Sequence, residues 1–167
     1  MNETYLFGFT EAKENELKIM LDIYNHYIVN STATFDWDKI TLEEFKNRIF
    51  MNNNKYKTFL IYINNELIGF CFLTRFREKI AYDKTVELGL YLKPQFTGKG
   101  YGKEIVRYME NIARLNQFET IIVSISGENV ASLKLFRKLE YEQCSHYKGI
   151  AMKFGRKIDI IDFQKVI

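Results

Sequence analysis

Residues 86–103, VELGLYLKPQFTGKGYGK, decide how this chain folds. The first part of the stretch, residues 86–92, is apolar apart from Glu87 and a central glycine, which predicts a buried strand with one carboxylate near its start. Pro94 lacks a backbone N–H, so the strand is expected to end before it. A glycine-rich turn follows, and from Tyr101 onward apolar residues recur at helical spacing. A strand, a glycine turn and a helix in this order aim free backbone N–H groups and the positive end of a helix at an anion.

The spacing of the glycines separates three phosphate-binding patterns. A P-loop would place its first glycine at Thr97 and a Ser or Thr at Glu104, so that pattern fails. A dinucleotide-binding fingerprint would place its third glycine at Lys103, so that pattern fails as well. The pattern Q-x-x-G-x-G is matched at every place, by Gln95, Gly98 and Gly100. The turn therefore follows the third of these patterns.

Size and composition predict a single domain over residues 1–167, with ample apolar material for a core. The net charge of +3 is too small for a nucleic-acid-binding surface, and the apolar runs are too short to span a membrane. The N-terminus lacks the basic segment and apolar core of a signal peptide. Cys71 and Cys144 form no C-x-x-C pair, which is typical of a reducing compartment. We therefore expect a cytoplasmic protein without a membrane or nucleic-acid partner.

Capping and turn signals place the other elements. After a β-rich opening at residues 4–10, Thr10 is expected to cap a helix over residues 11–29. A capping box that begins at Thr41 predicts a second helix over residues 42–51. The elements expected after it are a hairpin of strands 57–63 and 66–73 with an Asn64-Asn65 turn, a strand at 120–126, a helix at 129–139, and strands at 141–152 and 158–166. This order predicts a mixed α/β fold.

The order of elements and the Q-x-x-G-x-G match resemble the GCN5-related N-acetyltransferase (GNAT) superfamily, in which this motif binds the pyrophosphate of acetyl-CoA. Within that superfamily, motifs between residues 17 and 164 fall in the order and spacing of the phosphinothricin N-acetyltransferases and their amino-acid-acetylating relatives. These motifs are Asn25-His26-Tyr27-Ile28, Ser31-Thr32-x-x-Phe35, Ala81-Tyr82-Asp83, Glu87, Asn129-x-x-Ser132-x-x-Leu135, Gly155-x-x-x-Asp159 and Phe163-Gln164. The resemblance implies a central mixed β-sheet flanked by helices, acetyl-CoA as cofactor without a metal, and a homodimer to which the C-terminal strands contribute.

Glu87 is the predicted catalytic residue. An amine attacks a thioester only in its neutral form, whereas an α-ammonium has a pKa of about 8 and is mostly charged near neutral pH. A carboxylate at the start of the central strand is placed to remove that proton, directly or through a water, and similar enzymes place their base there. The alternative is a structural carboxylate paired with a basic neighbour such as Arg77 or Lys79.

The resemblance also implies how the cofactor is held. Similar proteins separate the central strand from its neighbour, here residues 120–126, and the pantetheine arm enters the gap, where a backbone N–H would stabilise the thioester oxygen. Lys99 and Lys103 either screen phosphates or are solvated, and Asn129 either reaches the pantetheine or only caps a helix. The predicted cofactor-binding residues are Leu90, Tyr91, Leu92, Gln95, Phe96, Thr97, Gly98, Lys99, Gly100, Tyr101, Gly102, Lys103, Asn129 and Ser132.

Two positions depart from the family pattern. Phe136 stands where many acetyltransferases have Tyr and phosphinothricin acetyltransferases have His, so no proton donor for the leaving thiolate is expected there. A thiolate of pKa near 8.5 is nonetheless a tolerable leaving group. Glu140 stands where the family has Gly, so either Glu140 adopts a turn that suits Gly or the turn differs.

The residues expected to bind the acceptor are Phe35, Arg77, Lys79 and Tyr82, with Trp37 as a further wall. Arg and Lys suit a substrate carboxylate, although a solvated charged loop is an equal reading. The resemblance implies that the function is acetyl transfer from acetyl-CoA to the α-amine of a small amino acid or analogue, such as phosphinothricin, methionine sulfone or methionine sulfoximine, by direct attack in a ternary complex.

Two other functions remain open from the sequence. In the first of these functions, the chain is an acetyltransferase whose acceptor is a peptide N-terminus or a polyamine. In the second, the chain is a non-catalytic acyl-CoA-binding sensor, which Phe136 favours and Glu87 opposes. His26 and His146 are expected to be packed or surface residues, and Cys71 a core residue, rather than catalytic groups.

Overall fold

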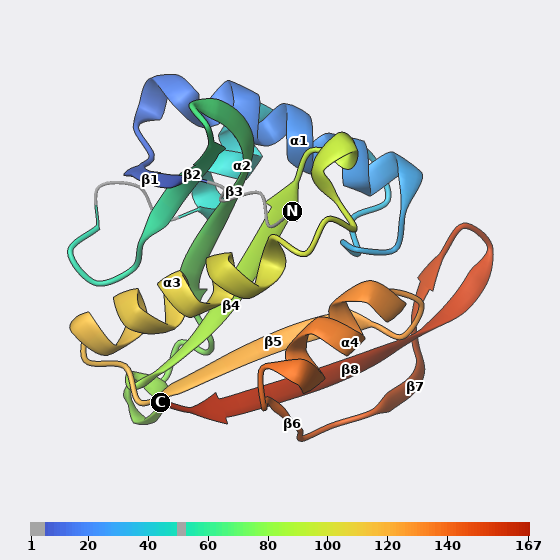
Figure 1. Ribbon diagram of the computed structural model, residues 1–167. Helices are drawn as coiled ribbons and strands as arrows, with labels where there is room; N and C mark the ends of the chain where they lie inside the picture. Colours follow the sequence, from blue (N-terminus) through green and yellow to red (C-terminus); the bar gives the residue numbers. More distant parts are fainter. Residues whose placement is uncertain (1–5, 50–52) are drawn as a thin grey trace.

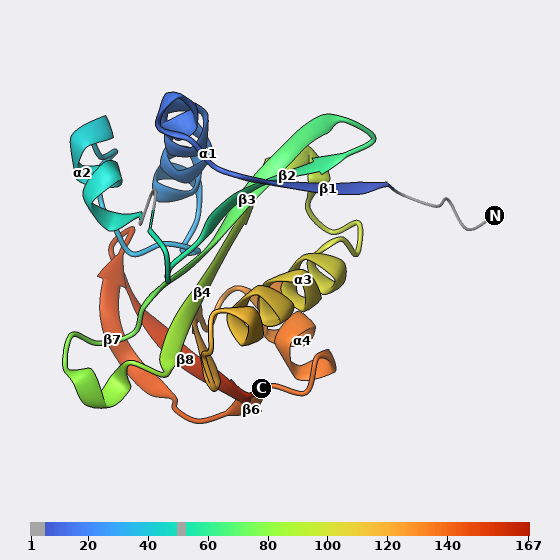
Figure 2. The same cartoon turned by 90° about the vertical axis from the view of Figure 1, so that its left-hand side faces the viewer.

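The computed structural model describes residues 6–49 and 53–167. It contains a twisted mixed sheet with α1 and α2 on one face and α3 and α4 on the other (Figures 1 and 2). The strands are β1 Phe7–Glu11, β2 Thr58–Ile63, β3 Glu66–Arg75, β4 Thr85–Leu92, β5 Thr120–Ser126, β6 Glu142–Gln143, β7 Tyr147–Lys153 and β8 Arg156–Val166. The helices are α1 Leu17–Asn30, α2 Leu42–Arg48, α3 Gly102–Leu115 and α4 Val130–Lys138. The expected mixed α/β architecture is confirmed.

The strand order is β1-β2-β3-β4-β5-β8-β6, and β7 also pairs with β8. β4 and β5 are parallel, and each of them is antiparallel to its outer neighbour. The two strands are connected through α3, which supplies the crossover that a parallel pair requires. The strand–turn–helix stretch of residues 86–103 therefore lies at the centre of the sheet.

The expected N-terminal helix begins later than predicted. Thr10 does not cap a helix but lies in β1, where it pairs with Leu60 of β2. α1 begins at Leu17, after a short turn in which the Lys13 N–H donates to the Glu16 carboxylate over 2.8 Å. Apolar periodicity could not locate this boundary because residues 7–11 form a strand by pairing with β2, which is distant in the sequence. Residues 4 and 5 of the expected opening lie outside the described residues.

Other local predictions are confirmed. Thr41 and Glu44 form the expected capping box of α2. The helix ends at Arg48, so Ile49, which was expected to be helical, is extended instead, and the expected residues 50 and 51 lie outside the described part. Asn64 and Asn65 join β2 to β3 with φ of 49° and 66°, as a tight hairpin requires. Glu140 takes the left-handed conformation that suits glycine, with φ of 64°.

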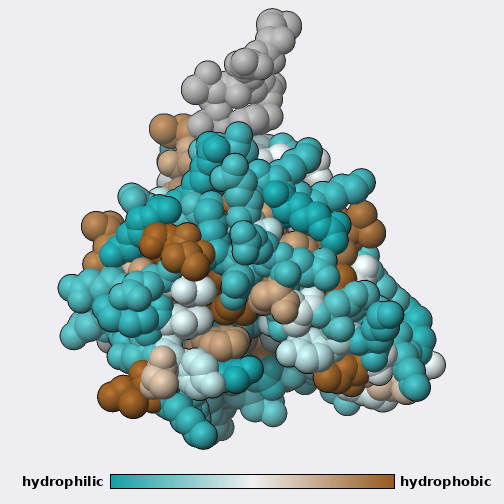
Figure 3. All heavy atoms as spheres, turned by 90° about the horizontal axis from the view of Figure 1, so that it is seen from below, coloured by the Kyte–Doolittle hydropathy of each residue, from teal (hydrophilic) through white to brown (hydrophobic). Residues whose placement is uncertain are grey.

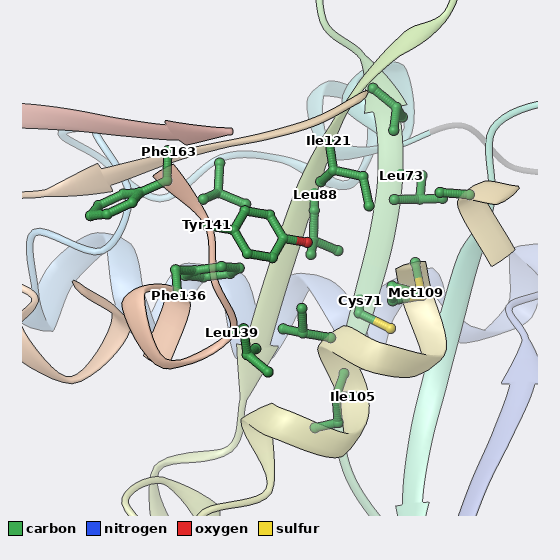
Figure 4. Packing of buried hydrophobic residues seen from close by; sticks show 14 of the residues in the cluster. Cys71, Leu73, Leu88, Ile105, Met109, Ile121, Phe136, Leu139, Tyr141 and Phe163 are labelled. Carbon is green, nitrogen blue, oxygen red and sulfur yellow. The ribbon is translucent and has the colours of Figure 1, made fainter. Parts of the chain in front are cut away.

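Two apolar clusters cover the two faces of the sheet. The larger lies under α3 and α4, where Leu88 of β4 and Ile121 of β5 pack with Met109 and Phe136 (Figure 4). The smaller joins α1 and α2 to β2 and β3. Cys71 is fully buried in the larger cluster, and its burial raises the pKa of its thiol far above the ordinary value, so the expected core role is confirmed.

One face of the molecule is mostly hydrophilic, with small separate hydrophobic patches (Figure 3). Among residues 6–49 and 53–167, none of the helices is both long enough and apolar enough to cross a bilayer.

The central feature of the sheet is a split between β4 and β5. The two strands pair only where Thr85–Glu87 face Thr120–Ile122. Beyond Glu87 they diverge, as Figure 1 shows, while β4 remains paired with β3 and β5 with β8 along their lengths. Residues 88–92 therefore present one edge of β4 to a gap inside the sheet, the gap that the family resemblance implies.

Candidate active site

The split between β4 and β5 opens into a cavity of about 390 Å³. Its walls come from both strands, from the turn before α3, from the start of α4 and from the end of α1. Of the predicted residues, the walls contain Glu87, Leu90, Tyr91, Leu92, Phe96, Thr97, Gly98, Gly100, Tyr101, Gly102, Asn129 and Ser132. The structure thus brings together the predicted base and most of the residues expected to hold the cofactor.

Glu87 is the one charged residue in the described walls of this cavity. It lies in β4 beside the last pairs that join β4 to β5, where the split begins. Burial raises the pKa of its carboxyl above the ordinary value, and the negative charge of Asp162 raises this pKa further. A raised pKa brings this carboxylate closer to neutral pH and makes it a stronger base toward an ammonium.

The structural alternative for Glu87 finds no support in the described residues. Glu87 forms no ion pair there, and Arg77 instead lies near Tyr82, with Arg77 Nη1 donating to the Tyr82 hydroxyl over 3.3 Å. The Arg77 guanidinium also lies 4.8 Å from the centre of the Phe76 ring. Glu87 is therefore available for a ligand.

The glycine turn is shaped to let a ligand approach the backbone. Gly98 and Gly100 have φ of 72° and 85°, and a methyl group added at either would meet no protein atom within 4 Å. At Gly102, by contrast, a Cβ atom would lie 2.7 Å from Leu135 Cδ2, so this glycine allows α3 to pack closely against α4. The first two glycines face open space and the third sets the helix packing.

The N-terminus of α3 is free to bind an anion. Tyr101 precedes the helix and provides no side-chain cap, and the first helical bond runs from the Ile105 N–H to the Tyr101 carbonyl. The N–H groups before Ile105 point out of the helix toward the turn without an intrahelical acceptor. Together with the two open glycines, these donors fit the pyrophosphate of acetyl-CoA.

Three of the predicted cofactor residues, Gln95, Lys99 and Lys103, are exposed and lie outside the cavity walls. Lys99 Nζ lies 5.3 Å from the centre of the Phe96 ring. Their roles toward phosphate groups remain predictions.

Asn129 acts as a helix cap. Its side-chain oxygen accepts a hydrogen bond from the Ser132 N–H over 3.1 Å, and both residues line the cavity. A contact of Asn129 with the pantetheine remains a prediction.

Phe136 also lines the cavity and is buried, with its ring packed edge-on against Tyr141 at 5.0 Å between centres. It supplies no proton, as expected. The hydroxyl groups in the walls belong to Tyr27, Tyr91, Tyr101 and to Thr and Ser residues.

The predicted acceptor residues lie elsewhere. Phe35, Arg77, Lys79 and Tyr82 are absent from the cavity walls, and the last three belong to the connection between β3 and β4. Trp37 is 63% exposed. The assignment of these residues to the acceptor therefore remains a prediction that the geometry of the cavity does not address.

Sequence reasoning missed Phe72 as a wall of the cavity. A Cβ atom at Gly89 would lie 2.1 Å from Phe72 Cζ, so the ring covers the β4 position between Glu87 and Tyr91. The glycine in the middle of an otherwise apolar strand was the available signal, because such a glycine marks a close approach. Tyr27 was also missed as a wall, although it lies within a quoted motif.

A polar network missed by the sequence analysis lies behind Tyr91. The Tyr91 ring packs against the ring of Tyr24 at 5.1 Å between centres, and the Tyr24 hydroxyl is 2.8 Å from that of Thr34. The Tyr24 hydroxyl donates to the Asp36 carboxylate over 2.8 Å, and Arg48 Nη1 lies 2.7 Å from both oxygens of that carboxylate. The network fixes the connection between α1 and α2 beside the cavity.

The two histidines lie away from the cavity walls and are exposed. His146 Nε2 is 2.7 Å from the Asp159 carboxylate, which also accepts the Gly149 N–H. In the described part of the chain, no cluster of three or more His, Cys, Asp or Glu side chains is arranged to hold a metal ion.

Comparison with known proteins finds a family model and relatives that match most of the chain. The family model described as "Acetyltransferase (GNAT) family" matches residues 20–141. A phosphinothricin N-acetyltransferase of Streptomyces coelicolor is 24% identical over 156 residues, which cover 91% of each chain. An L-methionine sulfoximine/L-methionine sulfone acetyltransferase of Pseudomonas aeruginosa is 24% identical over 158 residues, covering 92% of this chain and 91% of that one.

Among solved structures, a phosphinothricin acetyltransferase of Sinorhizobium meliloti in complex with acetyl-CoA superposes with a TM-score of 0.88 at 25% identity. The match covers 96% of this chain and 88% of that one.

Proposed function

This chain belongs to the acetyltransferase (GNAT) family, and from that membership we propose that it acetylates the α-amine of a small amino acid or amino-acid analogue. It is an N-acetyltransferase, and its GNAT relatives use acetyl-CoA. The proposed acceptors are of the phosphinothricin, methionine sulfone and methionine sulfoximine type, because relatives that match more than nine-tenths of this chain carry these names.

The observation that carries the proposal is the position of Glu87. It supplies the one charge in the described cavity walls, at the point where the β4 edge becomes free. A single carboxylate in a largely apolar, partly enclosed site suits the deprotonation of one amine, and a small cavity favours a small acceptor over a long peptide.

The chain's own groups account for binding and proton transfer. Acetyl-CoA, when bound, supplies a thioester carbonyl that an amine can attack. The free N–H groups at the start of α3 and the open turn at Gly98 and Gly100 would hold its pyrophosphate. The unpaired β4 edge at residues 88–92 would hold the pantetheine arm. Glu87 removes a proton from the acceptor ammonium, directly or through a water, and so produces the neutral nucleophile.

The proposal includes no acid at the Phe136 position. Its ring offers no proton, and the departing thiolate has an ordinary pKa of about 8.5, so it leaves without protonation. This differs from relatives that have Tyr or His at that place.

The test is release of free thiol from acetyl-CoA with a panel of amines: phosphinothricin, methionine sulfone, methionine sulfoximine, common amino acids, polyamines and short peptides. We expect turnover with the amino-acid analogues and its loss in Glu87→Gln, which keeps the shape of the side chain without a base. Acetyl-CoA binding by the variant, measured by calorimetry, should be unchanged because Glu87 lies away from the pyrophosphate turn. Turnover only with peptides or polyamines would keep the chemistry and reject the acceptor.

The non-catalytic sensor is the second candidate, and Phe136 is the observation that favours it. Binding of acetyl-CoA without turnover on every amine of the panel would decide for the sensor and against the proposed activity.

We also propose a homodimer, following the family resemblance. β7 and its turn carry four exposed apolar side chains, Tyr147, Ile150, Met152 and Phe154, each at least 45% exposed. Such a row on a sheet edge suits contact with a second copy. Light scattering after size-exclusion chromatography should give twice the mass of one chain. The Ile150→Lys variant should give the mass of one chain.

A further inference from the structure

A short segment closes the open end of the split between β4 and β5. At the end of β4, the Tyr27 hydroxyl donates to the Leu92 carbonyl over 2.5 Å. At the end of β5, the Ser126 hydroxyl donates to the Thr32 hydroxyl over 2.9 Å. Residues 27–34, called the strap below, thus run from one diverging strand to the other, and two of them, Tyr27 and Ala33, line the cavity.

The far side of the strap is fastened to the C-terminal hairpin. The Thr32 hydroxyl donates to the Glu128 carboxylate over 3.1 Å, and Arg156 holds that carboxylate with two hydrogen bonds of 2.9 and 2.8 Å. Lys153 Nζ donates to the Thr34 carbonyl over 2.6 Å. Lys153 and Arg156 flank the turn between β7 and β8, which lies beside the segment that follows α1 (Figure 2).

Lys153 is an unusual residue for this place. It is 2% exposed, and within the described residues its ammonium pairs with no carboxylate. A lysine is almost never fully buried without such a partner, because removing an ammonium from water is unfavourable. A methionine or leucine would fill the same space without that penalty, so what distinguishes Lys153 is the charge-assisted bond to the strap.

Thr34 connects this bond to the cavity wall. Its carbonyl accepts from Lys153, while its hydroxyl is 2.8 Å from that of Tyr24, whose ring packs 5.1 Å from the ring of Tyr91. Tyr91 lines the cavity and lies on the same face of β4 as Glu87, two strand repeats away. The opposite face of β4 packs under α3, whose N-terminus follows the pyrophosphate turn.

We propose that Lys153 is a positioning residue for the acceptor amine: by holding the Thr34 carbonyl it fixes the strap across the open end of the split. The wall formed by Tyr27, Ala33 and Tyr91 then stays at a constant distance from Glu87 when the acceptor enters. This inference rests on the proposed function, in which the acceptor reaches Glu87 in this cavity. The pyrophosphate turn is anchored separately by the packing of α3 against α4, so we expect Lys153 to affect the acceptor more than acetyl-CoA.

The test is Lys153→Met, which fills most of the same space with an unbranched side chain and removes its hydrogen bond, assayed with methionine sulfoximine as acceptor. We expect the KM for the acceptor to rise about tenfold, the size of one lost charge-assisted hydrogen bond. The KM for acetyl-CoA should change less than about twofold, and the melting temperature should not fall, because an unpaired buried charge is lost. The matched control is Lys157→Met, an exposed lysine of the same hairpin, for which all three values should stay unchanged.

A second readout needs no substrate. Trp37 is the only tryptophan in the sequence and follows the strap closely, so its fluorescence anisotropy reports how firmly this segment is held. We expect lower anisotropy in Lys153→Met than in the unchanged protein or in Lys157→Met. Thr32→Val, which removes the hydroxyl between Ser126 and Glu128, should act in the same direction with about a threefold rise in acceptor KM.

Each result decides the proposal. An acceptor KM within about twofold of the unchanged protein, or an equal rise in both KM values, overturns it. If Lys153→Met fails to fold, Thr32→Val takes its place with the same criteria. If no amine is acetylated, the proposed function fails and Trp37 alone tests the strap, where unchanged anisotropy in both variants overturns it.

Discussion

Two features of its surroundings raise the pKa of the Glu87 carboxyl. Burial is the larger, and the charge of Asp162 adds to it. Asp162 lies in β8 opposite Ser124 of β5, and one of its carboxylate oxygens is buried without a hydrogen-bond partner among the described residues. The charge of Asp162 therefore acts on Glu87 across the base of the split.

This arrangement predicts the acid limb of the pH–rate profile. Protonation of Glu87 removes the base, so kcat/KM should fall as the pH drops through the raised pKa. Asp162→Asn removes the neighbouring negative charge, lowers the pKa of Glu87 and should move this limb to lower pH. Rates measured from pH 5 to 9 with one acceptor check the shift.

Asp159→Asn is the matched control for that experiment. Asp159 lies three residues earlier in the same strand, where His146 and Gly149 hold its carboxylate. Since Asp159 contributes nothing to the pKa of Glu87, its substitution should leave the limb in place. A limb that does not move in Asp162→Asn would mean that Glu87 is not the titrating base.

The glycines of the pyrophosphate turn give a second prediction at this scale. Gly98 and Gly155 both have φ of 72° and both face open space, but only Gly98 lies in the cavity. Replacing either by Ala should reduce the free energy of unfolding by about 1 kcal/mol, because L residues are strained at this φ. Only Gly98→Ala should weaken acetyl-CoA binding, measured by calorimetry, since its methyl group occupies ligand space. Equal acetyl-CoA affinities of the two variants would contradict a phosphate-binding role for the turn.

At the scale of elements, α3 and β8 are joined by an ion pair whose carboxylate is buried and whose lysine is half-buried. Lys165 Nζ donates to Glu110 over 3.0 Å and to the Leu139 carbonyl over 2.8 Å, and Glu110 is 5% exposed. The bond to Leu139 fixes the end of α4, next to the strained turn at Glu140. This pair thus ties together three elements that pack under the cavity.

Breaking this pair should destabilise the fold strongly. Lys165→Met leaves the Glu110 carboxylate buried without a partner and should lower the free energy of unfolding in urea by about 3–5 kcal/mol. Glu110→Leu combined with Lys165→Met should recover most of that loss. Lys18→Met, which breaks the exposed pair with Asp22, should cost less than about 1 kcal/mol. A double variant as unstable as Lys165→Met alone would show that packing, not charge, is responsible.

Elements with local signals were predictable from the sequence, and those with distant partners were not. The capping box at Thr41, the Asn64-Asn65 turn and the crossover from Glu87 to α3 depend on neighbouring residues, so their patterns sufficed. The start of α1 was misplaced because β1 exists only through its pairing with β2. The short β6 strand likewise depends on β8.

At the scale of the molecule, the same distinction applies to the site. Glu87 and the glycine turn follow one another in the sequence, and so their place in one cavity was predictable. Tyr27, Phe72 and Lys153 reach the site or its strap from α1, β3 and β7, and no spacing rule connects them. The walls that other elements contribute are assembled by tertiary contacts, which is why the sequence predicted the walls from residues 87–102 more completely.

The gap between β4 and β5 leaves the sheet one strand short. A pantetheine arm that carries amide groups would occupy the place of the missing strand, so the native sheet is complete only in the liganded protein. Stability then becomes a function of the acetyl-CoA concentration: at 100 times the dissociation constant the free energy of unfolding should rise by about 2.7 kcal/mol.

Hydrogen exchange should show this gain first at residues 88–92 and 123–126, the facing edges of the gap, and less at β1 and β2. Uniform protection across all strands would contradict strand completion. In a cell, the lifetime of this protein against unfolding would thus follow the supply of acetyl-CoA, so that the enzyme is most durable when its donor is abundant.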